Sequence, residues 1–193
     1  MKPIVITSNS ILLLFLSSLL AFSGCTTGSE RQPLQTVDSV QLTHYLGTWK
    51  EIYRIPNRFQ DGEDPCKDTT AIYRMRKDGK IVVRNRCQRQ SGPEEVLGLA
   101  EVVEDTGNSR LRVNFTGIWL LRALGIGDGN YYILALGPVQ DNQYQWALVG
   151  EPQRKYGWIL ARQSLSDATL EKIFQKAVES GYERKQFRSF RAD

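Results

Sequence analysis

Apolar and polar residues alternate with a period of two through most of the chain from residue 49 to residue 162. The run from Ala71 to Arg76 is followed by an Asp78-Gly79 turn and by a second alternating run from Ile81 to Arg86, which predicts a β-hairpin. Further runs typical of short strands cover residues 49–55, 96–103, 111–115, 131–136, 144–149 and 156–162. No helical pattern separates these runs, so we expect eight antiparallel strands in a meander.

A helical period appears clearly only near the C-terminus, although residues 39–45 could form one short turn. Ser166 can cap the C-terminal helix and Gly181 can end it. Its apolar residues recur at spacings of three and four: Leu170, Ile173, Phe174, Ala177 and Val178. The strands at 131–136 and 146–149 are apolar on both faces, as strands are when both sides are covered. We therefore expect the helix to pack outside these late strands, with Tyr132, Leu134, Trp146 and Leu148 facing it and Tyr131, Ile133, Ala147 and Val149 facing inward.

The number of strands bears on how the sheet buries its apolar face. Eight antiparallel strands must pack on a second layer or close on themselves, and one helix is too small to cover the whole sheet. We therefore predict an all-β fold with one helix: an eight-stranded antiparallel up-and-down β-barrel with the C-terminal α-helix packed outside. The interior of such a barrel is either filled by side chains or wide enough for one small ligand.

The sizes of the inward-facing residues favour a cavity over a solid core. Small residues (Ala71, Gly98, Ala100, Ala135, Ala147) are interleaved with rings (Tyr53, Tyr73, Phe115, Tyr131, Trp158). A mostly apolar cavity with a few polar groups, such as Glu51 and Asn85, suits an amphiphile with an alkyl chain. The candidate pocket residues are Tyr53, Phe59, Tyr73, Val83, Asn85, Ala100, Val113, Phe115, Trp119, Tyr131, Ile133 and Trp158.

The first 24 residues have the pattern of a secretory signal. Lys2 gives a positive start, an apolar stretch runs from Ile11 to Phe22, and small residues precede Cys25. The stretch is short for a spanning helix, although a retained membrane anchor is the alternative. We expect a signal peptide over 1–24, a lipidated N-terminus and tether over 25–39, and the barrel domain over 40–193.

Phe22-Ser23-Gly24-Cys25 resembles the lipobox of bacterial lipoproteins, which implies acylation of Cys25. Thr26 stands where lipoproteins retained in the inner membrane typically carry Asp, so the resemblance implies an outer-membrane protein that faces the periplasm. Lipid on Cys25 would leave Cys66 and Cys87 as a pair in an oxidising compartment, where pairs form disulfides. Metal binding by these cysteines is the weaker alternative, because His44 is the only further soft ligand.

Composition and charge exclude other classes of protein. The 193 residues are 41% hydrophobic and 24% charged, which fits one globular domain rather than a disordered chain. The formal net charge of +4 falls to +3 without Lys2, too little to predict a nucleic-acid partner. Neither a metal nor a cofactor is expected.

Two motifs carry a resemblance to a known family. Gly47-Thr48-Trp49 with the following residues to Phe59 resembles the first signature of the lipocalins, in the version of bacterial outer-membrane lipocalins and their apolipoprotein D-like relatives. Trp158 to Arg162 resembles the last-strand signature, and the similarity extends from about Val40 to Phe190. The middle signature differs, because Leu136-Gly137-Pro138 stands where many lipocalins have Thr-Asp-Tyr.

The resemblance implies that Gly47, Trp49 and Arg162 are structural residues, with Arg162 against the Trp49 ring at the closed end of the barrel. A guanidinium over an indole ring is attracted by about 0.5 to 2 kcal/mol. The loops 54–68, 88–95, 117–130 and 151–156 then lie at the open end. Cys66 and Cys87 belong to this rim, consistent with a disulfide.

The apolar segment 117–127 is unusual for a rim loop and has three candidate uses: a lid on the ligand, a membrane-contacting lip and a homodimer interface. The function expected is non-enzymatic binding, storage or transport of a fatty acid or lysophospholipid at the bacterial outer membrane. An interaction module that uses this segment is the alternative. Enzyme activity is disfavoured because His44, the single histidine, lies far from the expected cavity.

Overall fold

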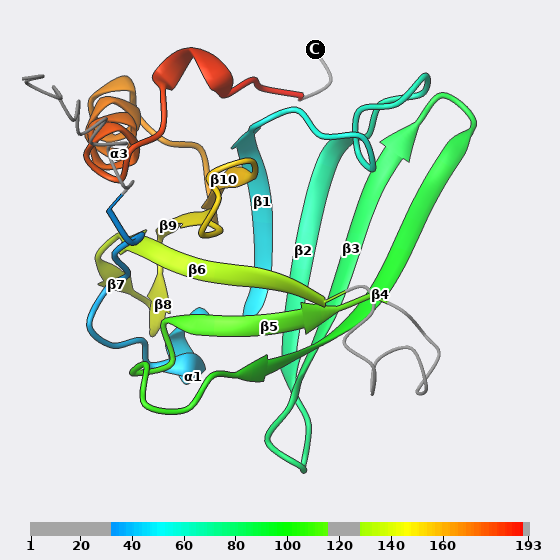
Figure 1. Cartoon of the computed structure of the whole chain (residues 1–193). Coiled ribbons are helices and arrows are strands. Elements are labelled where there is room, and N and C mark those ends of the chain that lie inside the picture. Colours follow the sequence, from blue (N-terminus) through cyan, green and yellow to red (C-terminus); the bar gives the residue numbers. More distant parts are fainter. Residues whose placement is uncertain (1–31, 116–127, 191–193) are drawn as a thin grey trace, which may run out of the picture. The chain divides into compact units, whose positions relative to one another are not determined.

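Eight strands close into an antiparallel barrel in the computed structural model, which describes residues 32–115 and 128–190 (Figure 1). Around the barrel the order is β1-β10-β9-β6-β5-β4-β3-β2. The barrel strands are β1 (Gly47–Arg54), β2 (Lys67–Met75), β3 (Ile81–Arg89), β4 (Gly92–Val102), β5 (Arg110–Asn114), β6 (Asp128–Leu136), β9 (Trp146–Gly150) and β10 (Gly157–Ala161). Pairing of β1 with both β2 and β10 closes the sheet, which confirms the predicted architecture.

The inner and outer faces of the late strands carry two separate apolar clusters. Ile133, Ala147 and Val149 belong to the interior cluster together with Trp49 and Tyr73. Tyr132, Leu134, Trp146 and Leu148 belong instead to an outer cluster that contains the apolar face of the C-terminal helix. The faces predicted for these seven residues are therefore confirmed.

The outer cluster is built around α3 (Asp167–Glu179). The Ser166 hydroxyl caps this helix by accepting a hydrogen bond from the Thr169 backbone N–H at 3.3 Å. Ile173, Phe174 and Ala177 are buried against the barrel wall. The short 3₁₀ helix η1 (Arg184–Gln186) follows, and Arg188 then pairs with Arg54 across the end of β1. No helix in residues 32–115 or 128–190 is long and apolar enough to cross a membrane.

Three register irregularities interrupt the barrel sheet over the described residues, and those in β1 and β6 reverse the faces that we expected for some side chains. In β1 the register with β10 shifts between Glu51 and Tyr53, and in β6 the register with β9 shifts between Ile133 and Ala135. A one-residue shift turns every following side chain to the opposite face. Tyr53 and Ala135, which we expected inside, therefore lie in the outer cluster.

The closed end of the barrel is covered by α1 (Leu42–Tyr45) and by a hairpin of β7 (Val139–Gln140) and β8 (Gln143–Tyr144). Leu136-Gly137-Pro138 leads into this hairpin, and a Cβ on Gly137 would lie 2.5 Å from an atom of the Trp146 ring. Glycine is thus required there by the close approach of the indole.

Candidate ligand-binding site

The closed end of the barrel has a rigid floor built on Trp49. The indole is fully buried and donates to the Tyr45 carbonyl at 2.8 Å, and the Arg162 guanidinium lies 3.6 Å from the ring centroid. Arg162 also donates to the carbonyl oxygens of Thr48 at 2.6 Å and Leu46 at 2.8 Å. Gly47 has φ +98°, and a Cβ there would lie 2.9 Å from a side-chain atom of Gln143. These contacts are all within the protein, and they support the structural roles that we expected for Gly47, Trp49 and Arg162.

Three tyrosines form a polar cluster above this floor. The hydroxyls of Tyr45 and Tyr131 are 2.6 Å apart, and the Tyr73 hydroxyl donates to that of Tyr131 at 3.1 Å. Burial raises the pKa of Tyr73 to about 12 and raises the pKa values of Tyr45 and Tyr131 well above 10. Burial also lowers the pKa of Arg162 to about 10. The tyrosines therefore remain neutral hydrogen-bonding groups at physiological pH.

The middle of the barrel is lined by apolar side chains. Val83, Ala100, Val113 and Ile133 are all at most 6% exposed and belong to the interior cluster. Tyr131 and Trp158 pack against the same cluster, so the structure brings these predicted pocket residues together with Tyr73. An inner face of this kind suits an alkyl chain.

Other predicted pocket residues lie at the rim or elsewhere. The Phe115 ring comes within 2.7 Å of where a Gly98 Cβ would be, and 40% of Phe115 is exposed. Phe59 is 54% exposed beside Tyr156, with ring centroids 5.4 Å apart, so it belongs to the rim and not to the interior.

Tyr53 is displaced furthest from its predicted place. Its ring packs edge-on against Phe174 of α3, with centroids 5.1 Å apart, because the β1 bulge turns it outward. Trp119 and the rest of the 117–127 segment lie outside the described residues, as does Cys25.

A buried cluster of charges occupies the mouth end of the interior. Arg54 follows the β1 bulge, pairs with Trp158 in the register and has no exposed surface. Its guanidinium contacts the Glu51 carboxylate at 2.5 Å, chelates the Asp61 carboxylate and donates to the Cys66 carbonyl at 2.8 Å. The Phe190 ring covers one face of the guanidinium at 3.6 Å. The side chains of Glu51 and Asp61 are 8% and 10% exposed.

Gln60 links this cluster to Trp158, which packs against the interior apolar cluster. Its amide N–H donates to the Glu51 carboxylate at 3.0 Å, and its carbonyl oxygen accepts from the Trp158 indole at 3.2 Å. Burial raises the pKa of Glu51, although the adjacent Arg54 cation opposes the shift. Glu51, Gln60 and Trp158 thus form a connected polar edge beside the apolar interior.

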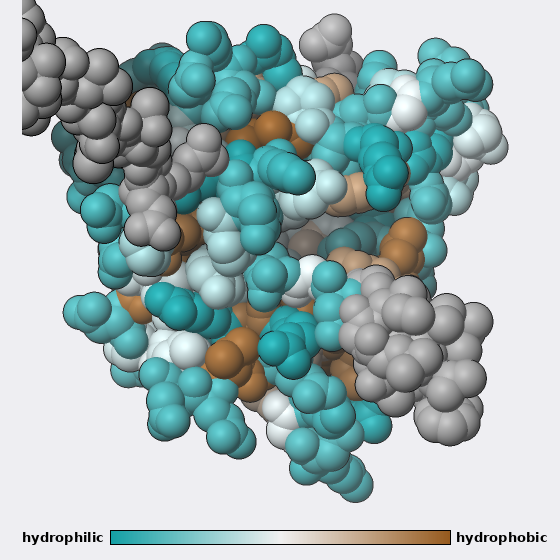
Figure 2. Space-filling view, in the orientation of Figure 1, coloured by the Kyte–Doolittle hydropathy of each residue, from teal (hydrophilic) through white to brown (hydrophobic). Residues whose placement is uncertain are grey.

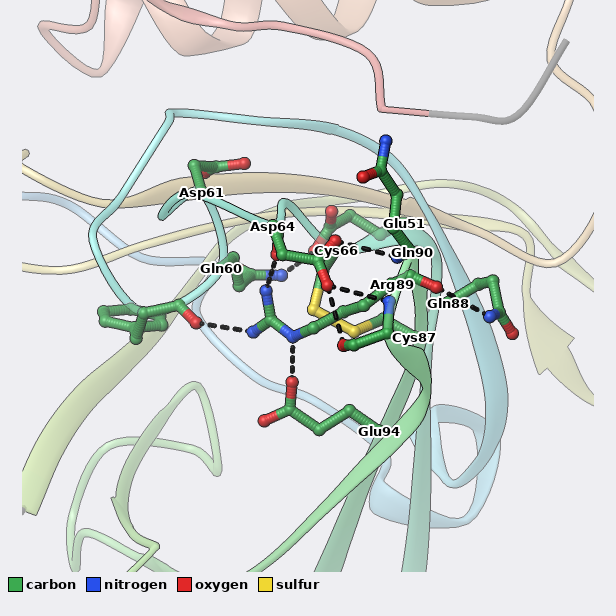
Figure 3. The surroundings of a disulfide bond; sticks show 12 residues. Glu51, Gln60, Asp61, Asp64, Cys66, Cys87, Gln88, Arg89, Gln90 and Glu94 are labelled. Atoms are coloured by element: carbon green, nitrogen blue, oxygen red, sulfur yellow. Dashed lines mark hydrogen bonds and ion pairs between the residues drawn. A yellow bond between two sulfur atoms is a disulfide. The ribbon is translucent and has the colours of Figure 1, made fainter.

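A disulfide and a network around Arg89 fix the loop over residues 55–66 to the β3–β4 hairpin (Figure 3). Cys66 and Cys87 are bonded with Cα atoms 5.3 Å apart, which confirms the predicted pair. Arg89 pairs with Glu94 and donates to the carbonyls of Asp64 and Phe59. The Asp64 carboxylate accepts from the backbone N–H groups of Gln90 at 2.8 Å and Ser91 at 3.0 Å. The mouth is therefore held in one arrangement on this side.

Hydrophilic residues dominate the face of the molecule drawn in Figure 2. In Figure 2 hydrophobic residues appear mainly in recesses between hydrophilic ones. The large apolar area of the described residues therefore lies mostly inside the barrel and under α3.

The geometry offers little for metal binding or nucleophilic catalysis among the described residues. The one close group of candidate metal ligands there is Cys66, Cys87 and Glu94, and its two sulfur atoms are consumed by the disulfide. His44 lies in α1 at the closed end, edge-on to Tyr144 with ring centroids 5.8 Å apart.

Several site residues escaped the sequence prediction. Arg54 and Asp61 were expected only as rim residues, and Thr69 was not singled out although it continues the inward alternation of Ala71 and Tyr73. Thr69 could have been found by extending the β2 pattern by two residues. Arg54 could not, because its inward direction depends on the bulge.

A closed eight-stranded barrel with an apolar interior, a sealed floor and a polar mouth is the architecture of a carrier for small hydrophobic molecules. Residues 40–192 match the model of the lipocalin-like domain, and the chain belongs to this family.

Curated relatives and solved structures agree with this assignment. The chain is 32% identical to "Outer membrane lipoprotein Blc" of Citrobacter freundii. The alignment covers 82% of this chain and 83% of that protein. The chain is also 31% identical to "Temperature-induced lipocalin-1" of Arabidopsis thaliana, in an alignment that covers 80% of this chain and 81% of that protein. Insecticyanin of the tobacco hornworm Manduca sexta is similar in fold, with a TM-score of 0.62 and 17% identity over 84% of this chain and 86% of that one.

Proposed function

We propose that this protein binds a fatty acid or a lysophospholipid inside its barrel and stores, scavenges or transports it at the outer membrane of a bacterium. The observation that carries this proposal is the inner face, which is apolar in the middle of the barrel, above the tyrosine hydroxyls, and becomes polar again at Glu51 and Arg54. Burying about ten methylenes of an alkyl chain contributes about 8 kcal/mol before ordering costs, enough for micromolar binding.

The location rests on the sequence of the N-terminus and on the relatives. Cys25 in its lipobox-like context would carry the lipid, and the similar protein of Citrobacter freundii is named an outer membrane lipoprotein. More than one acyl chain is needed for stable anchoring. We expect the Cys25→Ser variant to be lost from the membrane fraction, and mass spectrometry of the N-terminal peptide should show acylation only in the wild type. A membrane-bound C25S protein would contradict the lipid anchor.

Ligand binding is tested by narrowing the mouth from the inside. Val96 pairs with Asn85, on the inward face, whereas its neighbour Leu97 points outward and is 52% exposed. We expect Val96→Trp to weaken the binding of a fluorescent fatty acid by about tenfold, or about 1.4 kcal/mol. The matched Leu97→Trp variant should bind like the wild type. Equal binding by all three proteins, or no binding by the wild type, would contradict the proposal.

A further inference from the structure

Two buried polar atoms at the mouth end of the barrel have no hydrogen-bond partner. They are the Thr69 hydroxyl oxygen and the Asn85 side-chain carbonyl oxygen. Thr69 is 8% exposed, so its hydroxyl is withdrawn from bulk water. Folding normally pairs such atoms, because an unsatisfied buried polar group is destabilising. An atom left unpaired on the inner wall of a binding protein points to a ligand atom that completes it.

The strand pairing places Asn85 on the inner wall, and the burial of Thr69, which lies within the irregular register between Lys67 and Thr70, indicates the same face of β2. Asn85 of β3 lies directly opposite Ala71 of β2, a member of the interior cluster. Thr69 precedes Ala71 by two residues on the same strand, and the alternation of burial continues through it. Extending the pairing of Lys50 with Thr70 by one residue places Glu51 of β1 beside Thr69. Three neighbouring strands thus each contribute one polar side chain.

The charges around this patch select the kind of group that fits. Glu51 and Asp61 supply two buried carboxylates against the single guanidinium of Arg54. Arg54 already donates to both carboxylates and to the Cys66 carbonyl, and the Phe190 ring covers one face of the Arg54 guanidinium. The groups that can still form hydrogen bonds at this patch are therefore mostly acceptors, the Asn85 and Glu51 oxygens. The Thr69 hydroxyl can donate or accept. An anionic head group at this patch would lie beside the Glu51 and Asp61 carboxylates, and Arg54 is already paired with both of them.

We propose that Thr69, Asn85 and Glu51 form a subsite that receives an uncharged hydroxyl group of the bound amphiphile. The ligand hydroxyl donates to the Asn85 or Glu51 oxygen, and its own oxygen accepts from the Thr69 hydroxyl. This subsite rests on the proposed binding of a hydrophobic ligand and, of the two proposed classes, favours the lysophospholipid, whose glycerol carries a free hydroxyl, over the fatty acid. It discriminates against a carboxylate at the same position.

The test compares three probes with the same alkyl chain on the full-length protein: oleyl alcohol, its methyl ether and oleate. The ether keeps the oxygen acceptor but lacks the donor, so the subsite predicts that the alcohol binds about five- to tenfold more tightly than the ether. The alcohol should also bind more tightly than oleate. Titration followed by tryptophan fluorescence, to which Trp158 beside Gln60 contributes, gives the dissociation constants.

Variants separate the subsite from general effects. Asn85→Leu removes an acceptor of the ligand hydroxyl and should reduce the preference for the alcohol, whereas the nearly isosteric Thr69→Val removes the donor to the ligand oxygen and should weaken binding of the alcohol and the ether alike. Thr70→Val is the matched control, because Thr70 pairs with Arg86 on the opposite face of β2, and it should bind the alcohol and the ether like the wild type. Either variant alone tests the subsite if the other does not fold.

The outcomes are distinguishable from failure of the proposed function. Equal affinity of the wild type for alcohol and ether, as expected if ordered water alone fills the site, would overturn the subsite while binding itself persists. Tighter binding of oleate that is insensitive to Thr69→Val would overturn it as well. Absence of binding by all three probes would overturn the proposed function and the subsite together.

Discussion

At the scale of single residues, Arg54 makes more contacts than expected for a residue that the sequence places in a rim loop. It is fully buried, yet it holds two carboxylates, a backbone carbonyl and an aromatic ring. A buried cation is tolerated only when its charge is matched and its N–H groups are paired. The residue therefore ties β1, the following loop and the C-terminal segment to one point.

Replacement of Arg54 should be far more damaging than replacement of one of its partners. Arg54→Met leaves Glu51 and Asp61 buried without a counter-charge, and we expect the free energy of unfolding to fall by about 3 to 5 kcal/mol. Glu51→Gln keeps the hydrogen-bond geometry and leaves Asp61 to pair with Arg54, so we expect a loss of about 1 kcal/mol or less. Chemical denaturation measures both variants. An Arg54→Met protein as stable as Glu51→Gln would contradict the assigned role.

The tyrosine cluster predicts a loss of stability at alkaline pH. Tyr73 has a folded-state pKa of about 12, and the pKa values of Tyr45 and Tyr131 are also raised by burial, whereas tyrosines in the unfolded chain titrate near 10. The unfolded state therefore loses protons first, and the free energy of unfolding falls as pH rises from about 10 to about 12. Below pH 10 these groups are protonated in both states and contribute no pH dependence.

Arg162 acts in the opposite sense over the same interval, because burial lowers its folded-state pKa to about 10. Because Arg162 alone opposes three tyrosines, we expect the free energy of unfolding to fall, on balance, as the pH rises through this interval. Denaturation curves at several alkaline pH values measure it, and Tyr73→Phe should make the slope shallower. A stability that rises with pH above 10 would contradict this account.

At the scale of elements, α3 and the outer wall form one packed layer. Phe174 is 5% exposed and contacts the rings of Tyr53 and Phe187, with centroids 5.1 Å and 5.9 Å apart. The Arg184 guanidinium lies 4.7 Å from the Phe174 ring centroid. The helix thus shields the side of the barrel at which the chain is apolar on both faces.

Truncation of Phe174 should open a cavity between the helix and the barrel. We expect Phe174→Ala to lower the free energy of unfolding by about 3 to 5 kcal/mol. Val178→Ala on the same helix is the control, because Val178 is 54% exposed and its truncation should change stability by less than about 0.5 kcal/mol. Thermal unfolding followed by circular dichroism distinguishes the two. Similar losses would show that α3 packs differently.

Periodicity in the sequence was sufficient for most of the element-level structure, and the bulges mark where it failed. The alternation in β2, β3 and β9, and in β6 up to its bulge, correctly separated inner from outer faces, and the helical spacing identified the buried side of α3. In β1 the extra residue between Glu51 and Tyr53 leaves no signature in hydrophobicity, because Ile52 and Tyr53 suit either face. The prediction therefore placed Tyr53 in the pocket and overlooked Arg54.

At the scale of the whole molecule, the disulfide joins parts of the mouth that the barrel alone would leave loosely connected. Cys66 and Cys87 are 21 residues apart in the chain, and the Asp64 and Arg89 network reinforces the same junction. Closing a loop of this size stabilises a fold by about 3 kcal/mol in the chain-entropy model.

Removal of the disulfide should therefore lower stability while leaving the contacts of Trp49 and Arg162 at the closed end of the barrel intact. We expect the double variant Cys66→Ser, Cys87→Ser to lose about 3 kcal/mol in the free energy of unfolding. Reduction of the wild type should lower its unfolding midpoint similarly, whereas a reductant should leave the double variant unchanged. An unaltered midpoint after complete reduction, verified by thiol titration, would contradict this prediction.

The pairing of β1 with β10 has a kinetic consequence. Thr48 and Arg162, which meet at this seam, are separated by 114 residues, so the chain loses the entropy of a very long loop before the seam gives any stability in return. We expect refolding on a timescale of milliseconds to seconds, with Trp49 reaching its final environment in the last phase. Stopped-flow fluorescence that compares wild type with Trp49→Phe would detect that phase. Until that moment the nascent sheet has two unpaired edges, and it is then that the chain is most exposed to aggregation.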